Sequence, residues 1–313
     1  MARHTILIDC DPGQDDALAI LLALASPEEI ELLAVTTVGG NVPLAKVTRN
    51  ARQIVELAGF PEMPVHAGCP RPILKPLETA EYVHGESGIN GYDFPPPARP
   101  PAPGHGVDVI VSTVMERPPG TVTLVGTGPL TNLALAIVKA PEIVPRLARI
   151  VVMGGAIGVG NATPAAEFNI WVDPHAAAVV FECGAPITMF GLDVTHQVVV
   201  TPERRRRLAA LGNRTGAAAA GMLEFFSRFD ESRYGLGGGL LHDPCTVAWL
   251  IRPELFSGRD CHVAIETEGR HSTGRTLVDW WPRMQRETNA FVADAVDADG
   301  FFDLLAERLA RLP

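Results

Sequence analysis

Four aspartates lie close together near the start of the chain, just after a short apolar run: Asp9, Asp11, Asp15 and Asp16. Closely spaced carboxylates repel one another, and burying them is costly unless a cation neutralises the charge or protons are shared. Oxygen ligands alone suit a hard cation such as Ca²⁺ or Mg²⁺. Alternatively, one aspartate caps a following helix and the others face solvent. That alternative accounts for Asp15 or Asp16 but not for four acids around the Pro12-Gly13 turn.

A second chemically suggestive group is His242-Asp243-Pro244. Proline in a first helical turn makes Asp243 a candidate N-cap, which would be a purely structural role. A cap does not account for His242, whose ordinary pKa of about 6.5 suits proton donation near neutrality. The imidazole could also bind a metal, although no second histidine lies at the spacing that zinc sites use.

Two amides and a carboxylate gather in a non-periodic segment that contains Asn161 and the run Glu167-Phe168-Asn169. Side chains of this kind bind hydroxyl groups, so a sugar or polyol would fit them. The alternative is turn formation, which explains Asn161 better than it explains the set. His84 lies in a polar, glycine-bounded loop and could face either a ligand or solvent.

The segments that must position these residues alternate between strand-like and helix-like patterns. We expect strands at 6–8, 31–37, 63–67, 121–127, 149–153, 187–190 and 262–267. We expect helices at 18–25, 44–58, 107–115, 130–140, 174–182, 202–233, 241–251 and 301–312. This order predicts an α/β fold with an open, mostly parallel, Rossmann-like sheet and helices on both faces. Ligands bind beyond the carboxyl ends of such strands, where several of the polar residues fall.

Composition narrows the possible functions of the chain. Its 313 residues are 47% hydrophobic and carry a net charge of −10, which predicts a sizeable core and argues against nucleic-acid binding. The five cysteines form no CxxC pair, so we expect reduced thiols and a cytoplasmic protein. No apolar run reaches about 18 residues, so no membrane span is expected. We interpret the Pro-rich segment 94–106 as a surface loop within a single domain, 1–313, and the arginine run 204–207 as a solvated helix face.

The stretch from Asp9 to Ala17 closely resembles the signature of the nucleoside hydrolases, the inosine–uridine-preferring family of nucleoside N-ribohydrolases. Further blocks follow in family order at 35–41, 83–88, 126–132, 153–155, 166–169, 191–196 and 242–245. The resemblance runs from about residue 5 to the C-terminus. It implies a nucleoside hydrolase fold and an enzyme that cleaves ribonucleosides into ribose and free base.

The resemblance also implies a Ca²⁺ ion as cofactor, held at the following positions: Asp11, Asp16, Asp243 and the backbone carbonyl of Thr127. Asp11 matches the general base, which acts on a water that the ion binds. His242 matches the acid that assists the leaving base.

Positions that match substrate-binding residues are spread along the chain. Those that match ribose-hydroxyl binders are Asp15, Asn41, Asn161, Glu167 and Asn169. Met153 is expected to pack near the 5′-hydroxyl, Phe168 is a further substrate-binding position in the same block as Glu167 and Asn169, and His84 is expected near the base. The segment 229–241 contains the glycine-rich stretch 233–239 and is expected to be mobile. It forms either a lid that presents Tyr234 or Phe229 to the base or a plain flexible loop.

Two blocks, 160–167 and 241–249, look more like pyrimidine-preferring members, which favours uridine and cytidine as substrates. The resemblance further suggests a homo-oligomer, a dimer or a tetramer. Two other functions remain open from the residues alone. One is a haloacid-dehalogenase-like phosphatase, which also begins with Asp-x-Asp after a strand. The other is a non-catalytic, calcium-dependent nucleoside- or ribose-binding protein.

Overall fold

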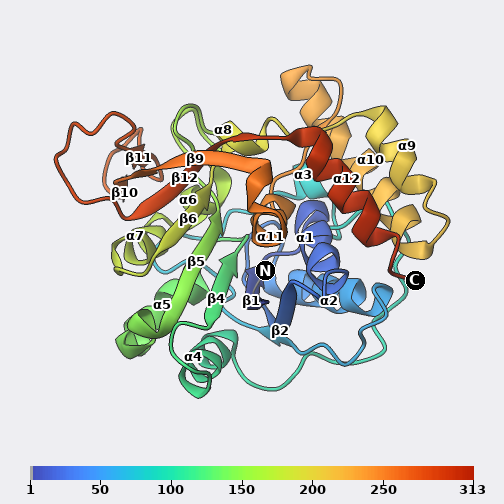
Figure 1. Cartoon of the computed structure of the whole chain (residues 1–313), viewed down its shortest axis with the longest axis horizontal. Helices are drawn as coiled ribbons and strands as arrows, with labels where there is room; N and C mark the ends of the chain where they lie inside the picture. The colour runs from blue at the N-terminus through green and yellow to red at the C-terminus, as the bar shows by residue number, and fades with distance from the viewer. Residues whose placement is uncertain (1–2) are drawn as a thin grey trace.

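The computed structural model describes residues 3–313 and contains a central sheet of eight strands (Figure 1). These strands are β1 (His4–Cys10), β2 (Ile30–Thr37), β3 (Val65–Ala67), β4 (Val122–Gly126), β5 (Leu147–Met153), β6 (Ile187–Phe190), β9 (Phe256–Cys261) and β12 (Ala290–Val296). Their order across the sheet is β3-β2-β1-β4-β5-β6-β12-β9, and all pairs are parallel except β12 with β9. The predicted open, mostly parallel α/β fold is confirmed.

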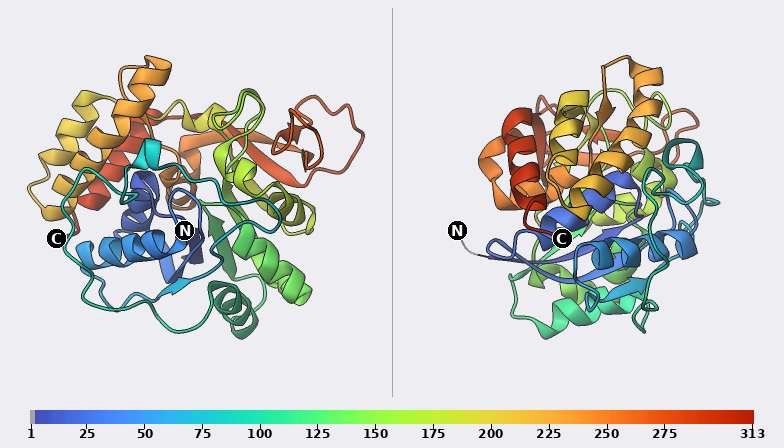
Figure 2. Two further views of the ribbon diagram at one scale, coloured as in Figure 1. Left: turned by 180° about the vertical axis from the view of Figure 1, so that it is seen from behind. Right: turned by 90° about the vertical axis from the view of Figure 1, so that its right-hand side faces the viewer.

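Two apolar cores lie on opposite faces of this sheet, because successive side chains of a strand point to opposite sides. In β1, Ile6 and Ile8 belong to one core and Leu7 to the other. The first core is covered by α1 (Gln14–Leu24), α2 (Leu44–Leu57), α10 (Arg214–Tyr234), α11 (Pro244–Ile251) and α12 (Ala298–Leu309). The second is covered by α4 (Gly106–Glu116), α5 (Thr131–Lys139) and α7 (Pro174–Glu182), and Figure 2 shows helices on both sides of the sheet.

The strand order reverses at β1, which has β2 on one side and β4 on the other. Loops that leave two such strands diverge, and the crevice between them is where α/β proteins bind ligands. Asp9 lies in register with Thr36 of β2 and with Gly126 of β4. The residues that follow these strands, including Asp11, Asn41 and Thr127, therefore meet at one edge of the sheet.

The C-terminal third differs from the pattern that the sequence suggested. The strand expected at 262–267 is β10 (Val263–Ile265), which pairs with β11 (Thr276–Val278) outside the central sheet. The central sheet instead gains β9 and β12. Polar residues and glycine fill the middle of β9, an edge strand, and alanines and an aspartate dilute β12, so neither sequence shows a strong strand pattern.

The helix expected at 202–233 is divided into α9 (Pro202–Ala209) and α10. Gly212 breaks it with a φ of 77°, and Asn213 caps α10 by accepting a hydrogen bond from the Gly216 N–H. Two arginines of α9 form ion pairs with α12. Arg204 pairs with Asp299 and Arg207 pairs with Asp303, as expected of a solvated helix face.

Several shorter elements complete the fold. They are α3 (Glu81–His84), α6 (Phe168–Val172), α8 (Leu192–Thr195), β7 (Val199–Val200), β8 (Gly239–Leu240) and the 3₁₀ helices Pro141–Arg146 and Pro253–Leu255. The helix expected from residue 241 begins at Pro244, because the chain before it pairs as β8 with β7. Across residues 3–313, no helix is both long enough and apolar enough to cross a membrane.

Candidate active site

A cavity opens at the carboxyl ends of β1, β2, β4 and β5, where most of the predicted site residues come together. Its lining includes Asp15, Asn41, His84, Thr127, Met153, Asn161, Glu167, Phe168, Asn169, Tyr234, His242 and Asp243. Asp11 and Asp16 do not line the cavity, and both side chains are buried. The structure thus gathers residues from across almost the whole sequence around one space.

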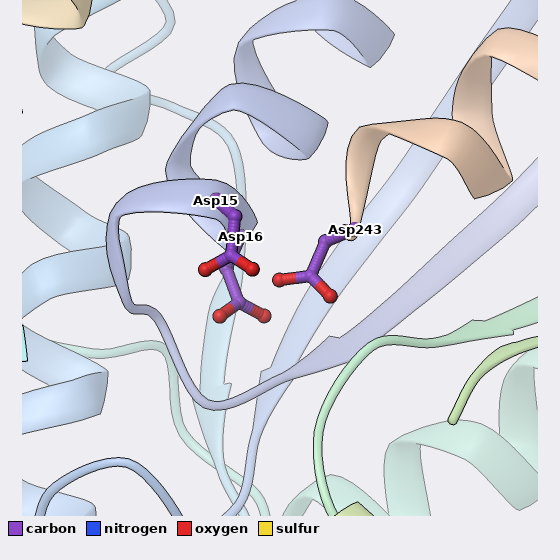
Figure 3. Close-up of side chains that lie close together, drawn as sticks. All are labelled: Asp15, Asp16 and Asp243. Atoms are coloured by element: carbon purple, nitrogen blue, oxygen red, sulfur yellow. The ribbon is translucent and has the colours of Figure 1, made fainter. Parts of the chain in front are cut away.

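Three carboxylates converge at this wall. Oxygen atoms of Asp15, Asp16 and Asp243 lie within 4.8 Å of one another, and all three residues are buried. Figure 3 shows the first turn of α1 facing Asp243 at the start of α11. Burial, with further repulsion from neighbouring carboxylates, raises the pKa of Asp15 to about 8 and that of Asp243 well above its usual range. The carboxylates therefore ionise only at a considerable cost in free energy.

Asp11 and Asp16 are held by the loops around them. The Asn41 N–H donates to Oδ2 of Asp11 at 2.7 Å. The Thr127 hydroxyl donates to Oδ1 of Asp16 at 2.7 Å, and the Gly13 N–H donates to Oδ2 of the same carboxylate at 3.0 Å. Asp16 thus does cap the start of α1, in line with the structural alternative, but only one of the four aspartates is explained in this way.

The capping interpretation of Asp243 is wrong. Asp243 stands at the N-cap position of α11, but its side chain accepts no capping hydrogen bond from the helix. Its φ and ψ of −63° and −38° are helical, which differs from the extended conformation usual for a capping residue. Its carboxylate instead joins Asp15 and Asp16.

The donor set fits a hard cation. Within the described part of the chain, Oδ1 of Asp11 and Oδ1 of Asp15 are buried without a hydrogen-bond partner. Buried polar atoms are rarely left in this state, so these oxygens call for a ligand or a proton. The Thr127 carbonyl accepts a hydrogen bond from Nδ2 of Asn169 at 2.7 Å and keeps a second lone pair. The three carboxylates that converge in the structure include Asp15. The calcium ligands that the family resemblance implies include Asp11 instead.

Asp9 has a different setting. Its Oδ1 accepts hydrogen bonds from the Thr36 hydroxyl at 2.6 Å and from Nδ2 of Asn132 at 2.7 Å. These bonds tie β1 to β2 and to α5. Burial raises the pKa of Asp9 to about 7, and the residue does not line the cavity. A supporting role beneath the site follows from these contacts.

The amide and carboxylate side of the cavity is organised by Glu167. Its Oε1 accepts from the Asn169 N–H at 2.9 Å, and its Oε2 accepts from the Gly155 N–H at 2.9 Å. Glu167 thereby caps α6, so Phe168 and Asn169 lie on a short helix rather than in an irregular segment. Asn161 accepts a hydrogen bond from the Phe168 N–H at 2.9 Å. Burial raises the pKa of Glu167 to about 7.

Two histidines that line the cavity each form a hydrogen bond through Nδ1. In His84 this atom lies 2.7 Å from Oε1 of Gln14, and in His242 it lies 2.7 Å from Oγ1 of Thr195. Burial lowers the pKa of each histidine to about 3. The expectation that His242 titrates near neutrality is therefore wrong, because a pKa of about 3 leaves the partly buried ring neutral at pH 7.

Several residues that line the cavity or support its wall were not predicted from the sequence. His196 lies beside His242, with ring centroids 5.8 Å apart, and it also lines the cavity. Phe226 stacks on His84 at 5.5 Å. The unpredicted residues are Gln14, Tyr82, Thr195, His196, Phe226 and Asp230. Apolar residues at helical spacing in α10 indicate a core helix, whereas Gln14, Thr195 and His196 fall within family blocks without an assigned role.

The stretch expected to form a lid begins within a helix. Tyr234 is the last residue of α10, and Gly235 ends the helix with a φ of 65°. Only residues 235–238 then separate α10 from β8. Tyr234 does line the cavity, and Arg233 donates to the Asn161 carbonyl across the mouth at 3.0 Å. The prediction of mobility for this segment stays a prediction.

The fold and the site together define an α/β protein with a buried oxygen-donor centre at the switch point of its sheet. The family model for inosine-uridine preferring nucleoside hydrolases matches residues 6–303. The chain belongs to this family, and it is an enzyme that hydrolyses ribonucleosides.

Comparisons with individual proteins agree with this membership. A Schizosaccharomyces pombe protein whose name assigns no activity is 51% identical over 98% of this chain and 99% of its own. The pyrimidine-specific ribonucleoside hydrolase RihA of Citrobacter koseri is 46% identical over 97% of each chain. Among solved structures, a plant nucleoside hydrolase superposes with a TM-score of 0.92 at 34% identity, covering 99% of both chains. A purine-preferring ribonucleoside hydrolase from Gardnerella vaginalis gives 0.91 at 36% identity, covering 98% of both.

Proposed function

We propose that this chain uses Ca²⁺ to hydrolyse the N-glycosidic bond of ribonucleosides and that it prefers the pyrimidine nucleosides uridine and cytidine. The observation that carries the proposal is the convergence of buried Asp15, Asp16 and Asp243 at a cavity that also contains amide, imidazole and aromatic side chains. Such a wall suits a hydroxyl-rich sugar joined to a planar base.

The proposed calcium ligands are Asp11, Asp16, Asp243 and the Thr127 carbonyl. All of these donors are oxygen atoms, which Ca²⁺ prefers, and the cluster needs positive charge because its carboxylates are buried together. When bound, Ca²⁺ would orient the ribose hydroxyls and lower the pKa of the attacking water. Asp15 and Asn41 are assigned to the ribose hydroxyls beside the ion.

Asp11 is the proposed general base. The Asn41 N–H fixes its Oδ2, whereas its buried Oδ1 has no protein partner and is the atom proposed to take the proton of the attacking water. Cleavage of the glycosidic bond passes through an oxocarbenium-like state. The surrounding carboxylates favour the positive charge that develops on the ribose.

We assign binding of the 5′-hydroxyl side of the ribose to the segment around Glu167. Three side chains are proposed to bind near the 5′-hydroxyl: Asn161, Glu167 and Asn169. Backbone N–H groups already occupy much of the Glu167 carboxylate, so its role there combines positioning of α6 with binding. Met153 and Phe168 are proposed to pack against the sugar.

We assign contacts with the leaving base to three residues: His242, His84 and Tyr234. Because burial keeps His242 neutral, we propose that it assists the departing base as a hydrogen-bond donor rather than as an imidazolium. Tyr234 is proposed to stack on the base.

The pyrimidine preference is supported by the similarity to RihA, whereas the purine-preferring relative is also similar in structure. A ribose-release assay on uridine, cytidine, inosine and adenosine, with and without a chelator, tests both parts of the proposal. We expect the highest kcat/KM for uridine or cytidine and loss of all turnover with chelator. Inosine as the best substrate would overturn the base preference, and full activity in excess chelator would overturn the calcium dependence.

We further propose that the chain acts as a single catalytic domain, assembles as a dimer or tetramer, and is cytoplasmic. The free cysteines support a reducing compartment. Sedimentation velocity on the purified protein tests the assembly, and a monomer at micromolar concentration would contradict it.

A further inference from the structure

Two histidines of the cavity wall differ in what their Nδ1 atoms contact behind it. A neutral imidazole ring carries its proton on one nitrogen, and its other nitrogen is a hydrogen-bond acceptor. The partner of Nδ1 therefore decides which hydrogen-bonding group Nε2 offers to the cavity.

Thr195 constrains His242. The Thr195 side chain is fully buried, and its Oγ1 lies 2.7 Å from Nδ1 of His242. Throughout residues 3–313, Thr195 Oγ1 has no other hydrogen-bond partner. If Nδ1 carried a proton and donated it, the hydroxyl proton of Thr195 would be buried without an acceptor, which is costly. The hydroxyl therefore donates to Nδ1, and the His242 proton resides on Nε2.

Gln14 constrains His84 in the opposite sense. Its Nε2 donates to the carbonyls of His84 and Asn90, at 3.0 and 3.1 Å. A flipped amide would turn its oxygen toward two carbonyl oxygens, so Oε1 must be the atom that faces Nδ1 of His84 at 2.7 Å. An amide oxygen can only accept, so Nδ1 of His84 carries the proton.

The Nε2 atoms of both rings are available to a ligand. Neither atom has a hydrogen-bond partner in the described part of the chain. Neither is among the fully buried polar atoms that lack a partner, so both remain accessible. Both histidines line the cavity. One wall therefore offers two neutral imidazole nitrogens of opposite character.

We propose that Thr195 is a positioning residue that holds His242 with its proton on Nε2, as a donor to the leaving base. Gln14 holds His84 in the other tautomer, with Nε2 as an acceptor. This inference rests on the proposed function for the identity of the ligand. The pair suits a base that carries both a hydrogen-bond acceptor and an N–H donor on its edges, as uracil and cytosine do.

The tautomers can be measured without substrate or activity. Long-range ¹H–¹⁵N correlation spectra of the histidine-labelled protein distinguish Nδ1–H from Nε2–H rings, and His242→Gln and His84→Gln assign the two signals. We expect an Nε2–H pattern for His242 and an Nδ1–H pattern for His84. A proton on Nδ1 of His242, or on Nε2 of His84, would overturn the corresponding assignment.

Thr195→Val tests the positioning role, because valine keeps the shape of threonine and removes the hydroxyl. We expect the His242 signal to lose its pure Nε2–H pattern and kcat on the best nucleoside to fall about tenfold, with KM nearly unchanged. Turnover of p-nitrophenyl riboside, whose leaving group needs no proton, should change little. Thr195→Ser, which restores the hydroxyl, should behave like the parent protein.

Thr48→Val provides the matched control, since Thr48 is also buried and its hydroxyl bonds to Thr37 away from the cavity. Equal loss on both substrates in Thr195→Val, or an unchanged His242 signal, would reduce Thr195 to a structural role. If the parent protein released ribose from no nucleoside, the proposed function would fail, while the spectra would still decide the tautomers.

Discussion

The Asn41 N–H donates to Oδ2 of Asp11 at 2.7 Å and so joins the loop after β2 to the loop after β1. Nδ2 of Asn41 also donates to the Asp11 carbonyl at 3.1 Å. Gly40 and Gly128 approach the same carboxylate from two sides: a Cβ atom on Gly40 would lie 2.0 Å from Oδ2, and one on Gly128 would lie 2.6 Å from Oδ1. The backbone at Gly40 and Gly128 therefore packs directly against the Asp11 carboxylate and leaves no room for a side chain.

Gly40→Ala should abolish most turnover, because the new methyl group must displace Asp11 or the loop. Overpacking of this kind costs about 1–3 kcal/mol of stability, so the variant should still fold. Ribose release and thermal unfolding measure the two effects, with Asp11→Ala as the inactive reference. Gly158→Ala is the control, since its Cβ meets nothing closer than 3.2 Å. Parent-like kcat in Gly40→Ala would show that the position of Asp11 is not critical.

His242→Ala should bind calcium and ribose normally but lower kcat on ordinary nucleosides by about 10²-fold or more. The expected cause is loss of the donor that assists the departing base. Activity on p-nitrophenyl riboside should fall much less. A parallel loss on both substrates would remove His242 from the leaving-group step.

Calcium should stabilise the folded chain, because it binds buried carboxylates that repel one another without it. At a 100-fold excess over Kd, one site contributes about 2.7 kcal/mol. The melting temperature of chelated protein, measured with added Ca²⁺, reports this directly. Asp243→Asn should abolish the rise, whereas Asp303→Asn, which alters an exposed partner of Arg207, should retain it. A full calcium-induced rise in Asp243→Asn would exclude that residue as a ligand.

Asp230→Asn should change how stability depends on pH. Burial raises the pKa of Asp230 to about 6, above the unfolded value of about 3.9, although the Leu240 N–H donates to its carboxylate at 2.8 Å. The folded state therefore holds the proton more tightly. The resulting stabilisation is present below about pH 4 and is lost as pH rises through about 6.

The asparagine variant lacks this contribution but keeps an oxygen acceptor for Leu240. Its free energy of unfolding in urea should match or exceed that of the parent at pH 7–8, and its pH dependence between 4 and 7 should be flatter by on the order of 2 kcal/mol. A variant that is less stable than the parent at pH 8, with the same pH dependence, would show that Asp230 is not a buried acid of raised pKa.

Much of the site was predictable because its residues carry strong local signals. The aspartates around Pro12-Gly13 are unusual in any buried turn, and alternating strand and helix patterns place them at the end of a parallel strand. Many residues of the family blocks, from Asn41 to Asp243, line the cavity. The strand pattern of the first 190 residues was equally clear, since strands buried on both faces are almost continuously apolar.

The errors have physical causes in long-range contacts. The edge strand β9 and the diluted strand β12 are stabilised by pairing rather than by local propensity. Asp243 has a sequence typical of a helix cap, and only its approach to Asp15 and Asp16 redirects its carboxylate. His242 has an ordinary pKa in solution, and burial, helped by the neighbouring His196 and His84, lowers it to about 3.

The sequence by itself determined the acidic turn, the α/β order of elements and the family, because these depend on residue types and spacings along the chain. Tertiary structure decided which atoms remain free at the cavity. Whether Asp11 keeps an unpartnered oxygen, and which nitrogen of His242 faces a ligand, depends on Asn41 in the loop after β2 and on Thr195 in α8. Hydrogen-bond partners of this kind are set by packing in three dimensions, which no local pattern encodes.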